Sequence, residues 1–252
     1  MNRQITKRLI IIFIILLGSV FAYKLVVSIF RTDAGHPTGL YEDEISYEIN
    51  PETILTSINT SETNVFTRIP ATPEVYSPLA SGSFSWDQTD YLTIANAFHN
   101  FVWKEDLQNW SLYSAEFLIQ QCQNNFGGFD YAHFDYFQRQ DKTYFVHGIT
   151  IAPLYSEIAS GETYYDYTSR WKSIDLTKIK ISADDALILA EKYGGEQARL
   201  SVGNDDCRVR LVLAPYVLGR DWGWSVFYFK GNSKIFDISI DPYTGKYEIL
   251  TR

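Results

Sequence analysis

Sequence motifs for nucleotide, metal or nucleophile chemistry are missing from this chain, and it has only four histidines and two cysteines among 252 residues. It has no glycine-rich phosphate loop ending in lysine, no dinucleotide-binding fingerprint and no Gly-x-Ser-x-Gly nucleophile elbow. Neither cysteine has a histidine or a second cysteine at metal-ligand spacing. We therefore predict no catalytic residue, no cofactor and no metal ligand, and we expect that the protein is not an enzyme.

Histidine is the residue at which hidden catalysis would be sought first. The four are His36, His99, His133 and His147. Asp130 and Asp135 flank His133, but residues 130 and 133 tend to point to opposite faces of a strand, whereas 133 and 135 share one face. We therefore expect no metal site there. A Ser/His/Asp arrangement stays open, because such residues can meet from distant positions.

Positive charge is also scarce outside the first 31 residues. The chain has 22 basic and 30 acidic residues, and every acidic residue follows position 31. Five basic residues precede that point, which leaves 17 basic against 30 acidic residues, or about −13. Such a charge disfavours nucleic acid as a partner.

One long apolar run is present, near the N-terminus. It extends over 9–22 and resumes over 25–30, with Lys24 as its single charge. A helix of about 22 residues covers roughly 33 Å, close to the hydrocarbon thickness of a bilayer. Three basic residues precede the run and acidic residues follow it, so we predict a single-pass anchor with a cytoplasmic N-terminus and an extracytoplasmic C-terminal part. The alternative is a signal peptide cleaved after Ala22, which exports the rest as well.

Export affects how the two cysteines are interpreted. Cys122 and Cys207 could form a disulfide in an oxidising compartment. It would close a loop of about 85 residues, for which chain entropy predicts roughly 4 kcal/mol of stabilisation. Two buried free thiols are the alternative.

Composition divides the chain into four segments. Residues 1–31 are the predicted membrane anchor, and 32–83 are rich in Ser, Thr and Pro, which predicts a flexible stalk. Some apolar residues within 41–58 could dock locally. Residues 84–180 and 181–252 are dense in aromatics and are expected to fold.

In the first folded segment, Asp87 is a plausible cap for a helix that ends near Trp103, because apolar residues recur there at helical spacing. Strands are predicted over 111–120, 129–138, 143–152 and 164–172, with Ser160-Gly161 among the breaks.

The second folded segment repeats this order. Ser182 and Asp185 form a capping-box pattern at the start of a helix that Gly194-Gly195 should end. Alternating apolar residues then predict strands over 207–213, 222–228 and 236–240, and a turn at 241–245 leads to a last segment over 246–250. The predicted fold class is therefore α+β, with two units of one helix and one antiparallel sheet each. A single larger sheet is equally compatible with this pattern.

Three stretches of the second segment resemble a PepSY-like domain. They are Ile181-Ser182-Ala183-Asp184-Asp185-Ala186-Leu187, Trp224-Ser225-Val226-Phe227-Tyr228, and Ile238-Ser239-Ile240-Asp241-Pro242-Tyr243-Thr244-Gly245-Lys246. The resemblance covers about residues 181–250. It implies a helix packed on a short antiparallel sheet, an exported or membrane-attached bacterial protein, and a role in inhibiting or modulating peptidases.

These patterns favour a non-enzymatic binding or regulatory module in the cell envelope, with a protein or peptide partner bound at a sheet edge or an aromatic surface. Trp222, Trp224 and Tyr164 are candidates for such a surface, although core packing explains them as well. The alternatives are an envelope hydrolase of unrecognised type and a structural protein of envelope assembly.

Overall fold

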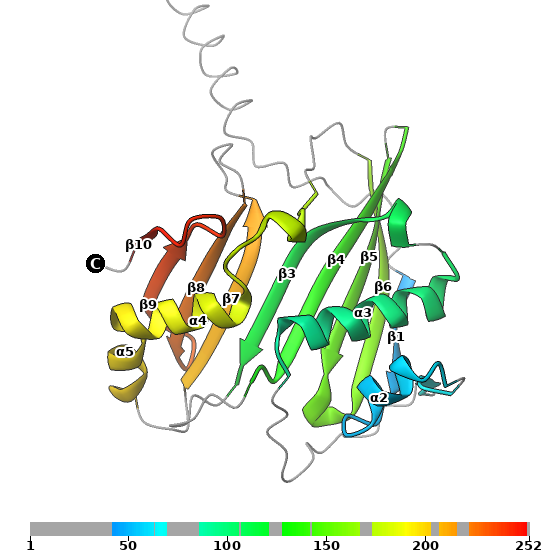
Figure 1. Cartoon of the computed structure of the whole chain (residues 1–252), viewed down its shortest axis with the longest axis horizontal. Helices are drawn as coiled ribbons and strands as arrows, with labels where there is room; N and C mark the ends of the chain where they lie inside the picture. Colours follow the sequence, from blue (N-terminus) through cyan, green and yellow to red (C-terminus); the bar gives the residue numbers. More distant parts are fainter. Residues whose placement is uncertain are drawn as a thin grey trace, which may run out of the picture.

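The computed structural model describes residues 42–62, 64–69, 86–105, 107–120, 128–141, 143–166, 173–202, 207–215 and 222–250. Within these residues, ten strands form one antiparallel sheet in the order β10-β9-β8-β7-β3-β4-β5-β6-β1-β2. Figure 1 shows α3 and α4 lying across the same face of this sheet. The prediction of two helix-plus-sheet units is therefore wrong, because the strands of both segments belong to a single sheet.

The first folded segment contributes the central and right-hand strands of Figure 1. Its elements are α3 (Gln88–Trp103), η1 (Leu107–Asn109), β3 (Ser111–Ile119), β4 (Tyr131–Gln140), β5 (Thr143–Ala152), η2 (Pro153–Tyr155), β6 (Glu157–Asp166) and η3 (Leu176–Lys178). The predicted cap of α3 is confirmed: the Asp87 side chain accepts from the backbone N–H of Asp90, and the Asp90 side chain accepts in return. The expected break at Ser160-Gly161 is wrong, because both residues lie inside β6 and pair with β5.

Part of the predicted stalk is folded. β1 (Glu42–Glu48) and β2 (Thr67–Arg68) extend the sheet beyond β6, and the helix α2 (Ile54–Asn59) lies between them in the chain. The physical reason is a small set of apolar side chains that become buried there, among them Tyr47, Ile54 and Phe66. Tyr47 and Phe66 both pack on Phe98 of α3, with ring centroids 5.1 and 5.0 Å apart. The Ser, Thr and Pro content of the whole segment does not reveal these few aromatic contacts.

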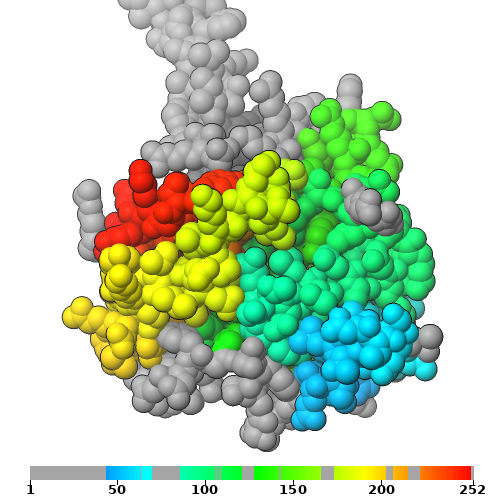
Figure 2. Space-filling model, in the orientation of Figure 1, coloured from blue at the N-terminus to red at the C-terminus, as the bar shows by residue number. Residues whose placement is uncertain are grey.

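The second folded segment contributes the other half of the sheet. Its elements are α4 (Ala183–Ala190), η4 (Glu191–Gly195), α5 (Glu196–Leu200), β7 (Cys207–Pro215), β8 (Trp222–Lys230), β9 (Ser233–Ile240) and β10 (Tyr247–Ile249). The capping box of Ser182 and Asp185 is confirmed. Gly194-Gly195 redirects the helix through the π-type turn η4, and α5 continues from it. Figure 2 shows α4, α5 and β10 next to one another on this face.

Strands β3 and β7 join the two halves. Ala115 pairs with Leu213, Phe117 with Leu211 and Ile119 with Val209, and all six side chains are buried in one hydrophobic core under the helices. On the opposite face the Arg210 guanidinium donates two hydrogen bonds to the Glu116 carboxylate, at 2.7 and 2.6 Å. Without this pairing β3 and β7 would each present an unpaired edge, so the single sheet satisfies their backbone groups.

Within the described part of the chain, no helix has the length and apolar character needed to cross a membrane. The predicted anchor over 1–31 lies outside the described residues.

Candidate functional site

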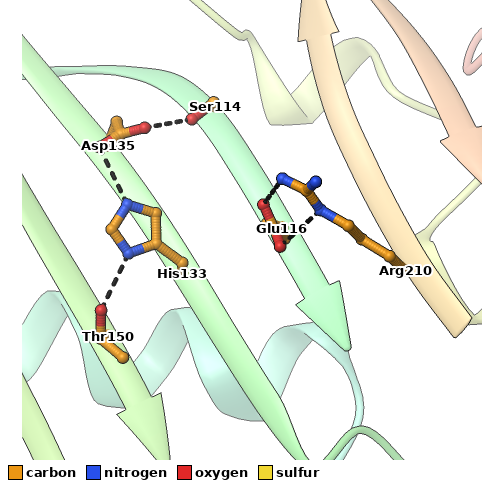
Figure 3. A network of polar contacts seen from close by, with 6 residues as sticks. All are labelled: Ser114, Glu116, His133, Asp135, Thr150 and Arg210. Carbon is orange, nitrogen blue, oxygen red and sulfur yellow. Dashed lines mark hydrogen bonds and ion pairs between the residues drawn. The ribbon is translucent and has the colours of Figure 1, made fainter. Parts of the chain in front are cut away.

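Two faces and one edge of the sheet carry groups that could serve a function. Side chains alternate along each strand, so one set points into the helix-covered core and the other to the opposite face. The opposite face carries the polar network of Figure 3, the core carries a buried histidine pair, and the β10 edge carries exposed apolar side chains.

The network of Figure 3 connects three central strands. His133 of β4 lies between Asp135 and Thr150: its Nε2 is 3.1 Å from Asp135 Oδ1, and its Nδ1 is 3.0 Å from Thr150 Oγ1. Ser114 of β3 donates to the other oxygen of Asp135 at 2.5 Å. A Cβ at Gly148 would lie 3.4 Å from His133 Cε1, an ordinary van der Waals contact, so the imidazole lies directly over this position.

Electrostatics favour the charged forms of His133 and Asp135. Burial lowers the pKa of His133, but the hydrogen bond and the charge of Asp135, with smaller contributions from Glu116 and Glu44, outweigh burial and leave the pKa above its ordinary value. Burial raises the pKa of Asp135, but His133 and Ser114 outweigh that effect and leave it below its ordinary value. The charged form of each group therefore favours the charged form of the other.

The order carboxylate, imidazole, hydroxyl is that of a nucleophile and its base. A protonated imidazole donates through both nitrogens, however, so it cannot take a proton from Thr150. The raised pKa of His133 thus favours a structural tie across β3, β4 and β5 over activation of Thr150. Asp130, the third residue considered for a metal, accepts instead from the Gln120 backbone N–H at 2.7 Å. No group of three His, Cys, Asp or Glu among the described residues could hold a metal ion.

A pair of histidines is buried between α3 and β5. Nε2 of His99 and Nδ1 of His147 are 3.0 Å apart, and both side chains are buried. The His147 ring is stacked on Trp103 and on Trp110, with centroid distances of 3.9 and 3.7 Å. Glu162 of β6 accepts from Trp103 Nε1, and one of its oxygens is 4.0 Å from His147 Nε2.

One tautomer assignment fits these surroundings best. If His99 Nε2–H donates to His147 Nδ1, then His147 carries its own proton on Nε2, facing the Glu162 carboxylate. His99 Nδ1 is then an acceptor without a partner, which costs less than a buried donor without one. Burial lowers the pKa of His99 to about 4, and burial together with the charge of His99 lowers that of His147 to about 3. Both rings are therefore neutral at pH 7.

The C-terminal edge of the sheet is the place where apolar side chains are exposed. Among the described residues, the large apolar side chains that are exposed all belong to the second folded segment: Ile188 (65%), Leu200 (59%), Tyr247 (44%), Ile249 (46%) and Leu250 (48%). Three of them lie in or next to β10, the last strand of the sheet. Exposed apolar side chains that gather at one edge mark an interaction site more often than scattered ones do.

The turn before β10 explains how this edge is positioned. The Asp241 side chain accepts from the backbone N–H groups of Tyr243 and Thr244, at 2.8 and 3.0 Å, and Gly245 takes a φ of +70°. The chain then returns beside β9, where the Tyr247 ring stacks on Tyr193 of η4 with centroids 3.9 Å apart. The turn and this stacked pair hold β10 against η4.

The three aromatic residues singled out from the sequence do not form one surface. Trp222 and Trp224 are buried, and Trp224 Nε1 donates to the Ile181 carbonyl at 2.8 Å. Tyr164 lies on β6, which four strands separate from β8, and its hydroxyl donates to Glu162. Cys207 is buried and disulfide-bonded, whereas Cys122 lies outside the described residues, so their pairing stays a prediction.

The sequence analysis did not identify the β10 edge as a site. The signal is present in Tyr247-Glu248-Ile249-Leu250, where apolar residues dominate the last segment of the sequence analysis, 246–250. Whether such residues are covered depends on whether another strand follows in the sheet, and this is a property of the tertiary structure.

No family model and no curated protein matches the chain. Among solved structures, the chain is similar to a dehydratase domain from the CurK module of curacin polyketide synthase, at 11% identity over 65% of this chain and 79% of that chain, with a TM-score of 0.16. Two inactive mutants of that dehydratase match at 9% identity and a TM-score of 0.13, over 65% of this chain and 81% and 80% of theirs. These scores are too low to indicate a shared fold or function.

Proposed function

We propose that this protein is a non-enzymatic binding module that holds a protein partner at the β10 edge of its sheet. The observation that carries this proposal is the exposure of Tyr247, Ile249 and Leu250 on the last strand of a ten-stranded sheet. An exposed apolar edge strand favours aggregation unless a partner covers it, so its presence favours a binding role.

The charge pairing of His133 supports a role without catalysis. The most enzyme-like arrangement among the described residues is Asp135, His133 and Thr150, and Asp135 raises the pKa of its imidazole, which favours the protonated form. A protonated base cannot activate the neighbouring hydroxyl. The same contacts stiffen the centre of the sheet, which suits a scaffold that presents an edge.

The location of the module is part of the proposal. The basic and apolar pattern of 1–31 supports a single-pass anchor that displays the sheet outside the cytoplasm, in the cell envelope. The PepSY-like resemblance of 181–250 includes β10 and supports a peptidase or another envelope protein as the partner. The excess of acidic residues argues against nucleic acid.

Site-directed photo-crosslinking in native membranes tests the proposal. A photo-reactive amino acid replaces Tyr247 in the full chain, and the matched control carries it at Gln140, which is exposed at the β4–β5 turn. We expect one dominant crosslinked protein from position 247 and none above background from position 140. If both positions give the same products as a chain reduced to its anchor, the β10 edge is not a binding site.

A further inference from the structure

The backbone of β10 has one hydrogen-bonding side that no described strand occupies. Leu250 N–H donates to the Asp237 carbonyl at 3.0 Å, and the Lys246 carbonyl accepts from Asp241 N–H at 2.8 Å, so residues 246 and 250 bond toward β9. Antiparallel strands alternate the direction of their backbone groups. The N–H and C=O groups of Tyr247 and Ile249 therefore point away from β9, toward the position of an additional strand.

The side chains of β10 define what a strand in that position would meet. Tyr247 pairs with Ile240 and Ile249 with Ile238, so both exposed apolar side chains lie on the helix-covered face of the sheet. Glu248 pairs with Ser239 on the opposite face and is exposed. A pairing strand would thus place two alternate residues beside apolar side chains, and the residue between them beside a carboxylate.

We propose that β10 accepts an extended peptide segment as an eleventh strand, and that this segment has a basic residue between two apolar ones. The inference rests on the proposed function and specifies its partner's chemistry. Backbone hydrogen bonds to residues 247 and 249 would give affinity. The apolar residues would cover Tyr247 and Ile249, and the basic residue would lie opposite Glu248 at cross-strand distance.

A second copy of the chain fits this edge less well. Two β10 strands that pair antiparallel through residues 247 and 249 place Glu248 opposite Glu248 of the other copy. Like charges directly opposite one another are destabilising, and the net charge of −8 adds repulsion between whole chains. Charge complementarity therefore favours a basic segment of another protein.

Peptide titration with a charge swap tests the side-chain part of the proposal. Two capped fluorescent peptides of alternating Thr and Val differ only at the centre, which is Lys in one and Glu in the other. Their anisotropy is measured against the full chain in lipid nanodiscs. We expect the Lys peptide to bind about fivefold more tightly than the Glu peptide, and the Glu248→Lys variant to reverse this preference. Equal affinity of both peptides for both proteins would overturn the charge assignment.

Proline substitution tests the backbone part. In Ile249→Pro the outward N–H is lost, while the inward bonds of residues 248 and 250 have no need of it, so the sheet should tolerate the change as edge strands do. We expect this variant to lose binding of the Lys peptide, and the matched Ile249→Val variant to retain it within about twofold. Retained binding by Ile249→Pro, with unchanged circular dichroism, would refute strand addition.

The outcomes separate this inference from the function on which it rests. If position 247 crosslinks a single protein but neither peptide binds, the binding edge stands and strand addition is wrong. If the chain instead forms dimers that Ile249→Pro abolishes, a second copy is the occupant and the basic segment is refuted. If crosslinking at position 247 fails as well, the proposed function falls together with this inference.

Discussion

Gly195 lies closer to the ring of Tyr228 than any other residue type would permit. A Cβ at position 195 would be 2.3 Å from the Tyr228 hydroxyl oxygen and 2.8 Å from the Ala190 carbonyl oxygen. The Tyr228 hydroxyl also donates to Glu191 at 2.7 Å, so the ring cannot move without losing that bond. The close approach of η4 to β8 therefore depends on glycine.

The Gly195→Ala variant should be strongly destabilised. Inserting a methyl group into this contact costs about 3 kcal/mol through displaced side chains and backbone. Gly161→Ala is the matched control, because a Cβ at that position meets nothing within 4 Å. We expect it to change the free energy of unfolding by less than about 1 kcal/mol. Urea unfolding followed by tryptophan fluorescence measures both, and an equal loss in the two variants would contradict the tight contact.

At the scale of elements, the contact of α3 with β5 depends on two histidines that must stay neutral. His99 belongs to α3 and His147 to β5, and their pKa values of about 4 and about 3 are depressed below the ordinary value of 6.5. Above pH 6.5 both are neutral in the folded and unfolded chain. Below it, the unfolded chain takes up protons that the folded chain excludes, so the folded state loses stability as the pH falls from about 6.5 toward 4.

We expect this loss to approach about 1.4 kcal/mol per pH unit for each histidine. His99→Phe/His147→Phe should flatten the slope between pH 6 and pH 4, because it removes both titrating groups. Replacing both partners by apolar rings also leaves neither imidazole unpaired in the core. His133 contributes with the opposite sign: its raised pKa adds stability that is complete below about pH 6.5 and is lost as the pH rises through the raised value.

The His133→Gln variant is therefore the control, and it should keep the acid slope. Asp135, whose pKa is lowered, adds stability that is complete above about pH 4 and is lost only as the pH falls below that value, so it does not affect the slope between pH 6 and pH 4. Unfolding midpoints are measured at several pH values for the unchanged chain, the double phenylalanine variant and His133→Gln. If the double phenylalanine variant keeps the slope of the unchanged chain, the buried pair is not the cause of the acid sensitivity.

Local elements could be predicted wherever short-range rules decide the structure. The cap at Asp87, the capping box at Ser182 and the strand Thr143–Ala152 follow from residues close together in the chain. The start of β6 could not be predicted in this way. Ser160-Gly161 is typical of a turn, but β5 on one side and β1 on the other supply hydrogen bonds that keep it extended.

For the whole molecule, the joining of two similar halves into one sheet is what the sequence could not decide. The strands β3 and β7 are adjacent, yet nearly a hundred residues separate Glu116 from Arg210. Both a two-unit and a one-sheet arrangement bury the same alternating residues, so the hydrophobic pattern favours neither. The candidate edge was missed for a related reason, because the exposure of Tyr247 and Ile249 depends on β10 being the last strand.

The predicted disulfide would connect these two halves a second time. Cys207 begins β7, pairs with Lys230 of β8 and is disulfide-bonded, and the chain's other cysteine is Cys122, which follows β3 in the sequence. A bond between them would close a loop of about 85 residues, so its removal should cost roughly 4 kcal/mol. We expect peptide mapping without reductant to recover residues 122 and 207 in one crosslinked fragment.

Stability measurements with reductant give the matched comparison. Reduction should lower the urea midpoint of the unchanged chain and leave that of the Cys122→Ala/Cys207→Ala variant unaltered, because the variant has no bond to lose. The β3–β7 ladder and the Glu116–Arg210 ion pair remain in both, so the difference isolates the covalent connection. Alkylation of both cysteines in protein purified without reductant would contradict the predicted pairing, and the two halves would then be held by the shared sheet alone.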